Sequence, residues 1–479
     1  MKLRLTLTVR AALTLSLLAC AVPHASAQRP APLGKSCHLP GAEEALRCLS
    51  VPVPLDYRQP KGEQLTLHVT VAPAFRESAN PDPLFVLAGG PGQGGSEILA
   101  VLHSTFRRVR ATRDVVFIDQ RGTGLSGRLA CANEKEHEGM SDTELETAMK
   151  KCIASVRQPY AAYSTANAAH DIEQVRKTLR YASINLLGAS YGTRLAQQYA
   201  RTYPARLRAL ILDGVVAPDQ IIPATGADGQ AALERVFADC AGDRACHAAY
   251  PDLRKQYAAL GERVGAGLKL DLPDPRTARP SKVTMTSERL LSTIHGILYS
   301  PLDSRRLPFL INSAHNNRWE PFVARQNMGA DFSPDGPVSH LMHLAVVCAE
   351  DVPRLRGQQS DTGSALTAPI LQRYQSLCAM MNVPAAPPPP TSQIKAPALL
   401  LSGALDPVTP PRRAIAAARY MGSAQHLVVN NAGHGIVQLG CTPRLLREFL
   451  DHPQRPVAAD CLKEIPAPAF QLGSAGPQP

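Results

Sequence analysis

The sequence lacks several features that would assign it to common protein classes. It holds eleven cysteines but no Cys-x-x-Cys pair, which argues against a zinc site or a thioredoxin-type site. Its 51 basic residues outnumber its 40 acidic ones, yet they are scattered, so we expect a solvated basic surface and no nucleic-acid partner. No segment after the N-terminal residues is long and apolar enough to predict a transmembrane span.

Motifs for bound phosphates and metals are also missing. The glycine-rich stretch AGGPGQGG at residues 88–95 is not followed by Lys-Ser or Lys-Thr, which argues against a phosphate-binding loop. His340 and His343 are three residues apart, but no third ligand accompanies them. We therefore interpret both as core or surface histidines and expect no metal.

Residues 1–27 predict a secretory signal peptide. Lys2 and Arg4 precede an apolar stretch at residues 11–22, a helix breaker at Pro23 and small residues that end at Ala27. We favour cleavage after Ala27; the alternative is a lipoprotein box that ends at Cys20 and would leave a lipid on that cysteine. In both cases we expect an exported protein, periplasmic or secreted.

Without Cys20 the eleven cysteines leave ten, an even number that favours disulfides in an exported chain. Spacing does not determine their connectivity, and our hypothesis is sequential pairing, which closes five short loops. The ten are Cys37, Cys48, Cys131, Cys152, Cys240, Cys246, Cys348, Cys378, Cys441 and Cys461.

The order of strand-like and helix-like patterns predicts an α/β fold with a doubly wound, mostly parallel sheet. Residues 64–71 alternate with period two, which is typical of a half-buried strand. Continuous apolar runs, typical of strands buried on both faces, follow at residues 84–87, 115–118, 184–187, 209–212 and 398–401. Helical patterns lie between them, for example at residues 168–179 and 194–203.

This alternation is interrupted between about residues 218 and 395, where the sequence is mostly helical and ends in four consecutive prolines. We predict a large, mainly helical cap, inserted after the sixth strand and lying over the edge of the sheet where the strands end. The expected domains are the signal peptide 1–27, the first part of the core 28–218, the cap 219–394 and the second part of the core 395–479.

Three residues at predicted strand ends form a candidate catalytic triad. Ser190 is the centre of GASYG, between a predicted strand and a predicted helix; Asp406 and His434 follow later strands. The order Ser, Asp, His is typical of α/β-hydrolases. A serine hydroxyl needs a base such as His434 to become nucleophilic, and Asp406 would hold the imidazole and stabilise its cation.

Backbone N–H groups would complete the site. The residue after the nucleophile is Tyr191, and the glycine-rich loop after the strand at residues 84–87 supplies Gly90; these two are our predicted oxyanion hole. Asp213 also ends a strand and could compete as the triad acid, but we favour a structural role. We expect Asp119 and Arg121 to organise their loop rather than perform chemistry.

The combination of these motifs resembles the prolyl aminopeptidase family of α/β-hydrolases. The motifs are GGPG at residues 89–92, DQRGTGLS at residues 119–126, the Ser190 turn, and the turns of Asp406 and His434. The cysteine-rich exported chain with a large cap most resembles the tripeptidyl aminopeptidase branch, with its TAP-like C-terminal segment. Ala88 departs from the pattern, because the family commonly has His before Gly-Gly-Pro-Gly. The resemblance implies hydrolysis near a free peptide N-terminus and no cofactor.

We therefore expect a serine exopeptidase whose partner is a peptide or a small amide or ester substrate. An esterase or amidase that uses the same triad is the alternative, and the intact triad argues against a binding protein that has lost catalysis. Glu350 and Asp351 are our candidates for binding the substrate's ammonium group, because negative charge is required there. We expect a monomer.

Overall fold

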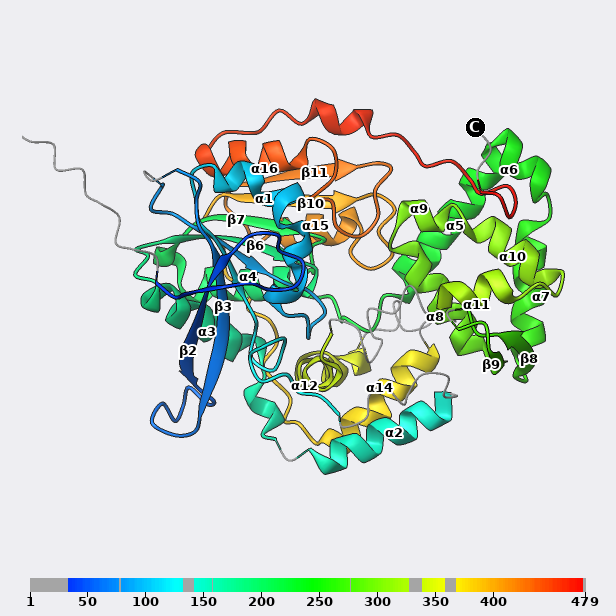
Figure 1. The fold of residues 1–479 in the computed structure, drawn as a ribbon, viewed down its shortest axis with the longest axis horizontal. Helices are drawn as coiled ribbons and strands as arrows, with labels where there is room; N and C mark the ends of the chain where they lie inside the picture. Colours follow the sequence, from blue (N-terminus) through cyan, green and yellow to red (C-terminus); the bar gives the residue numbers. More distant parts are fainter. Residues whose placement is uncertain are drawn as a thin grey trace, which may run out of the picture. The chain divides into compact units, whose positions relative to one another are not determined.

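The computed structural model describes residues 33–76, 79–131, 142–156, 158–275, 277–326, 338–357 and 368–476 (Figure 1). The predicted signal peptide, including Cys20, lies outside these residues and stays a prediction. No helix in the described ranges has the length and apolar character needed to cross a membrane.

A nine-stranded sheet forms the core, in the order β1-β2-β3-β5-β4-β6-β7-β10-β11. The pairs from β1 to β5 are antiparallel, and the pairs from β5 to β11 are parallel. The predicted mostly parallel α/β sheet is therefore confirmed. Its strands are β1 (Lys35–Cys37), β2 (Leu46–Pro54), β3 (Gln64–Ala72), β4 (Leu84–Leu87), β5 (Val115–Ile118), β6 (Ile184–Ala189), β7 (Leu207–Asp213), β10 (Ala398–Gly403) and β11 (Ala424–Val429).

Helices cover both faces of this sheet because its central strands are apolar on both sides. The core on one face includes residues of α3 (Thr165–Thr178), α4 (Tyr191–Thr202) and α15 (Pro411–Ala418). The core on the other face includes residues of α1 (Leu102–Arg110) and α16 (Thr442–Asp451). Short 3-10 helices lie at Gly95–Val101, Tyr160–Ala162, Pro204–Arg206, Val352–Gly357 and Asp460–Glu464.

The insertion begins after β7, so seven strands precede it rather than the expected six. Two of them, β1 and β2, come before the first strand that the sequence patterns predicted. Its first part, which we call the first lobe, has its own hydrophobic core. The lobe also holds an antiparallel hairpin that we did not predict, although Leu268, Leu270 and Leu272 alternate with polar residues. Its elements are α5 (Gly226–Gly242), α6 (Arg244–Ala249), α7 (Leu253–Val264), β8 (Leu268–Pro273), β9 (Pro280–Met285), α8 (Ser287–Leu298), α9 (Pro301–Ser304), α10 (Leu307–His315) and α11 (Glu320–Gln326).

The second lobe combines helices from two distant parts of the chain. Helices α12 (His340–Glu350) and α14 (Ala368–Met381) belong to the insertion, whereas α2 (Asp142–Ser155) precedes β6. Ser376 Oγ of α14 donates a hydrogen bond to Glu146 Oε1 of α2 at 2.8 Å. Figure 1 shows α2 and α14 side by side below α12. The helical layer near the sheet edge therefore includes a helix from outside residues 219–394.

The C-terminal segment extends from α16 to the first lobe (Figure 1, red). Phe470 is buried in the core of that lobe, and the Arg305 guanidinium lies 4.4 Å from its ring centroid. The Gln471 backbone accepts a hydrogen bond from Tyr250 Oη at 3.0 Å and donates one to the Arg305 carbonyl at 3.1 Å. The end of the chain thus connects the core to the first lobe.

The ten cysteines form disulfides in sequential order, which confirms the hypothesis of five short loops. The pairs are Cys37–Cys48, Cys131–Cys152, Cys240–Cys246, Cys348–Cys378 and Cys441–Cys461.

Candidate active site

Ser190 lies in the sharp turn between β6 and α4. Its φ of 53° and ψ of −123° are strained for a residue other than glycine. The turn is tight because Gly188 and Gly192 approach closely: a Cβ on Gly188 would lie 2.3 Å from the Gly192 carbonyl oxygen. The Ser190 N–H donates to the Asp213 carbonyl at 2.8 Å, which anchors the turn to the end of β7.

Asp406 and His434 form a hydrogen-bonded pair. Asp406 follows β10 and is buried, and its Oδ2 lies 2.8 Å from Nδ1 of His434. The backbone N–H groups of Val408 and Thr409 donate to its Oδ1 at 2.9 and 2.8 Å. Burial by itself would raise the pKa of Asp406. The attraction of His434 and the hydrogen bonds have a larger, opposite effect, so the pKa lies below its ordinary value. Asp406 is therefore held as a carboxylate against the imidazole.

Parallel register brings the Ser190 turn and the Asp406–His434 pair to one edge of the sheet. Ala189 pairs with Asp213, and Gly403 of β10 pairs with Val429 of β11, so these strands end together. Gly214, which follows β7, lies against the imidazole: a Cβ there would be 3.1 Å from His434 Cε1. Asp213, whose carbonyl accepts the hydrogen bond from Ser190, is thus followed directly by Gly214, which packs against His434.

We did not predict two of the residues that neighbour His434. Thr409 Oγ1 donates to Asp406 Oδ2 at 2.7 Å and lies 3.0 Å from His434 Nδ1. Tyr299 follows α8 of the first lobe; its carbonyl accepts from the His434 backbone N–H at 2.9 Å, and the two rings are T-shaped, 5.1 Å apart. Thr409 could have been found from its place three residues after Asp406, but nothing in the sequence linked residue 299 to residue 434.

The predicted oxyanion donor Tyr191 follows Ser190 in the chain, and the other, Gly90, follows Gly89 of the glycine-rich loop. A Cβ on Gly89 would lie 3.0 Å from Ser190 Cβ, so the glycine-rich loop touches the nucleophile turn. Gly90 has a φ of 102°, a conformation that favours glycine. Tyr191 is the first residue of α4, where backbone N–H groups lack partners within the helix. Its side chain is buried, and its hydroxyl lies 2.8 Å from Thr165 Oγ1.

His343 of α12 connects the second lobe to this loop. Its Nδ1 lies 3.1 Å from the Pro91 carbonyl oxygen, and its Nε2 lies 2.8 Å from Tyr374 Oη of α14. Burial lowers the pKa of His343 to about 4, so the ring is neutral. Because a carbonyl only accepts, Nδ1 carries the proton and Nε2 accepts from Tyr374. The Ser339 N–H adds a bond to the Gly92 carbonyl at 2.8 Å. The interpretation of His343 as a core residue missed this contact.

The structure places Glu350 and Asp351 at the end of α12, both buried. Asp351 receives two hydrogen bonds of 2.9 Å from the Arg194 guanidinium. Glu350 accepts from the backbone N–H and the hydroxyl of Thr165, at 2.8 and 2.7 Å. Burial raises the pKa of Glu350 above its ordinary value, despite the opposing charge of Arg194. Both carboxylates thus have partners in the structure, and contact of either with a substrate ammonium stays a prediction.

The remaining acids near the site have structural partners. The Asp213 carboxylate accepts from the backbone N–H groups of Ile436 and Val437, at 2.9 to 3.0 Å, and so holds the loop after His434. Asp119 accepts from Ser96 and Leu125.

Arg121 donates to Asp171, at 2.7 and 2.6 Å, and to carbonyls of neighbouring loops. Asp119, Arg121 and Asp213 thus have the loop-organising contacts that we expected. In the described residues, no cluster of three or more His, Cys, Asp or Glu side chains is arranged to hold a metal ion.

Two family models match the chain. The model described as the alpha/beta hydrolase fold matches residues 82–254, and the model described as TAP-like protein matches residues 366–461. The chain is similar to "Serine protease Hip1" of Mycobacterium tuberculosis, with 27% identity over 408 residues that cover 76% of each chain.

Two shorter matches point to the same family. "Tripeptidyl aminopeptidase" of Streptomyces coelicolor is 28% identical over 228 residues, 42% of each chain. "Proline iminopeptidase" of Neisseria gonorrhoeae is 31% identical over 144 residues, 29% of this chain and 36% of that protein. These matches together assign the chain to the prolyl and tripeptidyl aminopeptidase family of α/β-hydrolases and support a serine peptidase, with a TAP-like segment at residues 366–461.

Proposed function

We propose that this serine peptidase is an exported exopeptidase, which cleaves peptide bonds near free N-termini through Ser190, His434 and Asp406. The observation that carries the proposal is the 2.8 Å pair of His434 and buried Asp406, at the sheet edge where Ser190 occupies a strained turn. The names of the relatives, a serine protease and a tripeptidyl aminopeptidase, support the substrate class.

The proposed chemistry follows from the protonation of His434. A carboxylate only accepts hydrogen bonds, so in the neutral imidazole the proton lies on Nδ1 of His434, which faces Asp406, and Nε2 is the unprotonated nitrogen. Nε2 takes the proton of Ser190 Oγ as that oxygen attacks the substrate carbonyl, and later delivers it to the leaving amine. The acyl-enzyme is then hydrolysed by water activated in the same way.

The backbone N–H groups of Gly90 and Tyr191 would stabilise the oxyanion of the tetrahedral intermediate. Backbone donors held in place before reaction need no reorganisation when the negative charge develops. The helix that begins at Tyr191 adds a favourable dipole at the same point. His343 supports this arrangement, because its hydrogen bond to the Pro91 carbonyl holds the residue next to Gly90.

Specificity for a free N-terminus requires a negative group in the lobes, and Glu350 and Asp351 remain our candidates. Asp351 already receives two hydrogen bonds from Arg194, so we favour Glu350 of the two. The variant Glu350→Gln should raise KM for free-amine peptides and leave KM for N-acetylated ones unchanged. A rise in KM for both kinds of peptide would show that Glu350 has a structural role and does not bind the ammonium group.

Paired substrates test the function as a whole. We expect rapid hydrolysis of aminoacyl to tripeptidyl anilides with free N-termini, and little of the same compounds after N-acetylation. Equal turnover of both would favour an esterase or amidase with the same triad. Ser190→Ala should abolish turnover, whereas Ser104→Ala, on the exposed side of α1, should not. Persistent activity of the Ser190 variant would refute the proposed nucleophile.

Export is supported by the five disulfides, because such bonds persist in oxidising compartments and are rare in the cytosol. Mass analysis of the mature protein tests it: a chain that begins at Gln28 indicates cleavage after Ala27, and a lipid-modified Cys20 indicates the lipoprotein alternative.

A further inference from the structure

The motif DQRGTGLS at residues 119–126 holds the glycine-rich loop at both of its ends. Gln120 Nε2 donates to the Ala88 carbonyl, directly after β4, at 3.1 Å. Asp119 accepts from the backbone N–H and the hydroxyl of Ser96, at 2.6 and 2.7 Å, in the 3-10 helix that follows the loop. Two consecutive residues of the motif thus fix the start and the end of the loop.

The contact made by Gln120 lies next to the nucleophile turn. The Ala88 carbonyl and the Gly89 N–H belong to one planar trans peptide group, so they point in opposite directions. A Cβ on Gly89 would lie 3.0 Å from Ser190 Cβ and 3.6 Å from Ser190 Oγ. Gln120 therefore fixes the orientation of the peptide group that immediately precedes the glycine in contact with Ser190.

Further carbonyls of the loop are held in a similar way. The Gly89 carbonyl accepts from the Gln93 N–H at 3.4 Å, and the Pro91 carbonyl binds His343. The N–H groups of Gly89 and Gly90, in contrast, have no acceptor among the described residues. With its carbonyls held, the loop keeps these N–H groups available to a substrate oxygen, as an oxyanion hole requires.

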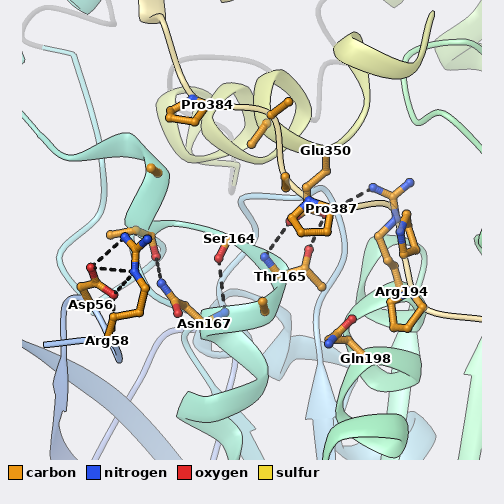
Figure 2. Close-up of a pocket in the computed structure, with 18 of the residues that line it drawn as sticks. Asp56, Arg58, Ser164, Thr165, Asn167, Arg194, Gln198, Glu350, Pro384 and Pro387 are labelled. Atoms are coloured by element: carbon orange, nitrogen blue, oxygen red, sulfur yellow. Dashed lines mark hydrogen bonds and ion pairs between the residues drawn. The ribbon is translucent and has the colours of Figure 1, made fainter. Parts of the chain in front are cut away.

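The other predicted oxyanion donor, Tyr191, is fixed by different residues. Its hydroxyl lies 2.8 Å from Thr165 Oγ1, which in turn donates to Glu350 Oε2 at 2.7 Å. Figure 2 shows this bond between Thr165, at the start of α3, and Glu350. Tyr191 is thus held through α3 and α12, whereas the start of the glycine-rich loop is held by Gln120.

The Gln120 side chain uses only part of its hydrogen-bonding capacity in a buried position. The residue is 3% exposed, and its Oε1 has no hydrogen-bond partner in the described part of the chain. A methionine of similar length would fill the same space without burying an unsatisfied acceptor. The property that the amide adds at this position is the N–H that binds the Ala88 carbonyl.

We propose that Gln120 is a positioning residue, which orients the Ala88–Gly89 peptide group and so holds the oxyanion loop against Ser190. It acts through the loop and not by contact with the substrate. The inference rests on the proposed function, because Ser190 and the N–H of Gly90 take their roles from it. It adds a residue of the sheet core to the contact that His343 makes with the same loop from the second lobe.

The test compares Gln120→Met with the parent protein in three measurements. With trialanine p-nitroanilide we expect kcat to fall about tenfold and KM to change by less than about twofold, because the loop stabilises the transition state. The rate at which a fluorophosphonate labels Ser190 should fall by a similar factor, since this probe needs the loop but no free N-terminus. The midpoint of urea unfolding should change little, because the unsatisfied Gln120 Oε1 is exchanged for an unsatisfied Ala88 carbonyl.

Gln197→Met is the matched control. Gln197 is also a buried glutamine whose Nε2 donates to carbonyls, those of Val216 and Thr193, at 2.9 and 3.2 Å. Its Oε1 is likewise without a partner among the described residues. Because Gln197 lies on α4 and not beside the glycine-rich loop, this variant should keep the parent kcat and labelling rate.

Several outcomes would overturn the inference. They are an unchanged kcat in Gln120→Met, a fall in kcat that Gln197→Met reproduces, and a rise in KM at constant kcat, which would assign Gln120 to substrate binding. A fall in kcat that disappears after correction for the folded fraction would assign Gln120 to stability alone and would overturn it as well.

Ser190→Ala separates this inference from the proposed function. Activity or labelling that survives Ser190→Ala would refute the proposed nucleophile. If both depend on Ser190 but do not change in Gln120→Met, only the positioning role of Gln120 is refuted.

Discussion

The two lobes over the sheet edge contact the candidate active site in different ways. The first lobe has a closed hydrophobic core and reaches the site at Tyr299, which contacts His434 by its ring and its carbonyl. The second lobe shares its core with residues of the β2 end and of the Ser190 turn, and its His343 binds the loop of Gly90. One lobe therefore supports the proposed base, and the other supports the proposed oxyanion hole.

The difference suggests which changes in each lobe affect catalysis. A change that loosens α12 or α14 is transmitted to Pro91 by a hydrogen bond within a buried cluster. Among the described residues of the first lobe, Tyr299 contacts His434 through its ring and its carbonyl, and His295 of α8 interacts with His434 electrostatically. We expect activity to be more sensitive to the second lobe than to the first.

Removal of one disulfide from each lobe should give the largest effects. Cys348–Cys378 closes a loop of 30 residues in the second lobe, and Cys240–Cys246 closes one of 6 in the first. Loop entropy predicts losses of about 3.6 and about 2.2 kcal/mol in the free energy of unfolding when each pair is replaced by alanines. Urea unfolding measures both. Only the second-lobe variant should also lose kcat, and an equal loss of kcat in both would contradict the comparison.

Substitution of Asp213 tests the contact between the sheet core and the loop that follows His434. Burial raises its pKa to about 6 from an ordinary value of 3.8, so the folded protein binds more protons than the unfolded chain between those pH values. Stability should therefore fall as pH rises from about 4 to about 6, by an amount of the order of 3 kcal/mol.

Asp213→Asn keeps an acceptor for Ile436 and Val437 and should remove this decrease. Urea unfolding of both proteins at a series of pH values measures it. A decrease that persists in the variant would assign the pH dependence to another group.

Substitution of His343 should lower kcat by about tenfold to a hundredfold, somewhat less than the loss of an oxyanion donor itself. His343→Leu removes the hydrogen bond to Pro91, whereas His343→Asn offers an amide N–H near the position of Nδ1 and should recover part of the rate. KM should change little in both variants. A rise in KM with constant kcat would contradict this role. Equal kcat values for the leucine and asparagine variants would show that His343 contributes packing and not a hydrogen bond.

The smallest effect is expected at Tyr299 in the first lobe. Tyr299→Leu removes a T-shaped ring contact with His434, worth about 0.5–1.5 kcal/mol, and keeps the backbone hydrogen bond. We expect kcat to fall by about twofold to tenfold, and Tyr299→Phe, which keeps the aromatic ring, to retain more activity than Tyr299→Leu. A larger loss of kcat than that caused by His343→Leu would show that activity depends more on the first lobe than on the second.

Much of the fold was predictable because it depends on local patterns. Apolar runs such as residues 184–187 and 398–401 can be buried only in a sheet covered on both faces, and they became β6 and β10. The Ser190 turn was also predictable, since the glycines at 188 and 192 are required by the close approach of strand and helix. The sequential disulfides followed the expected short loops, although spacing alone left other pairings open.

The sequence by itself determined the sheet, the order of Ser190, Asp406 and His434, and the turn that exposes the serine, because each depends on neighbours along the chain. Only the tertiary structure decided that α2 joins the second lobe, that Phe470 enters the first, and that His343 and Tyr299 contact the site. Those contacts join residues far apart in the chain, and their energies depend on packing that no local pattern contains.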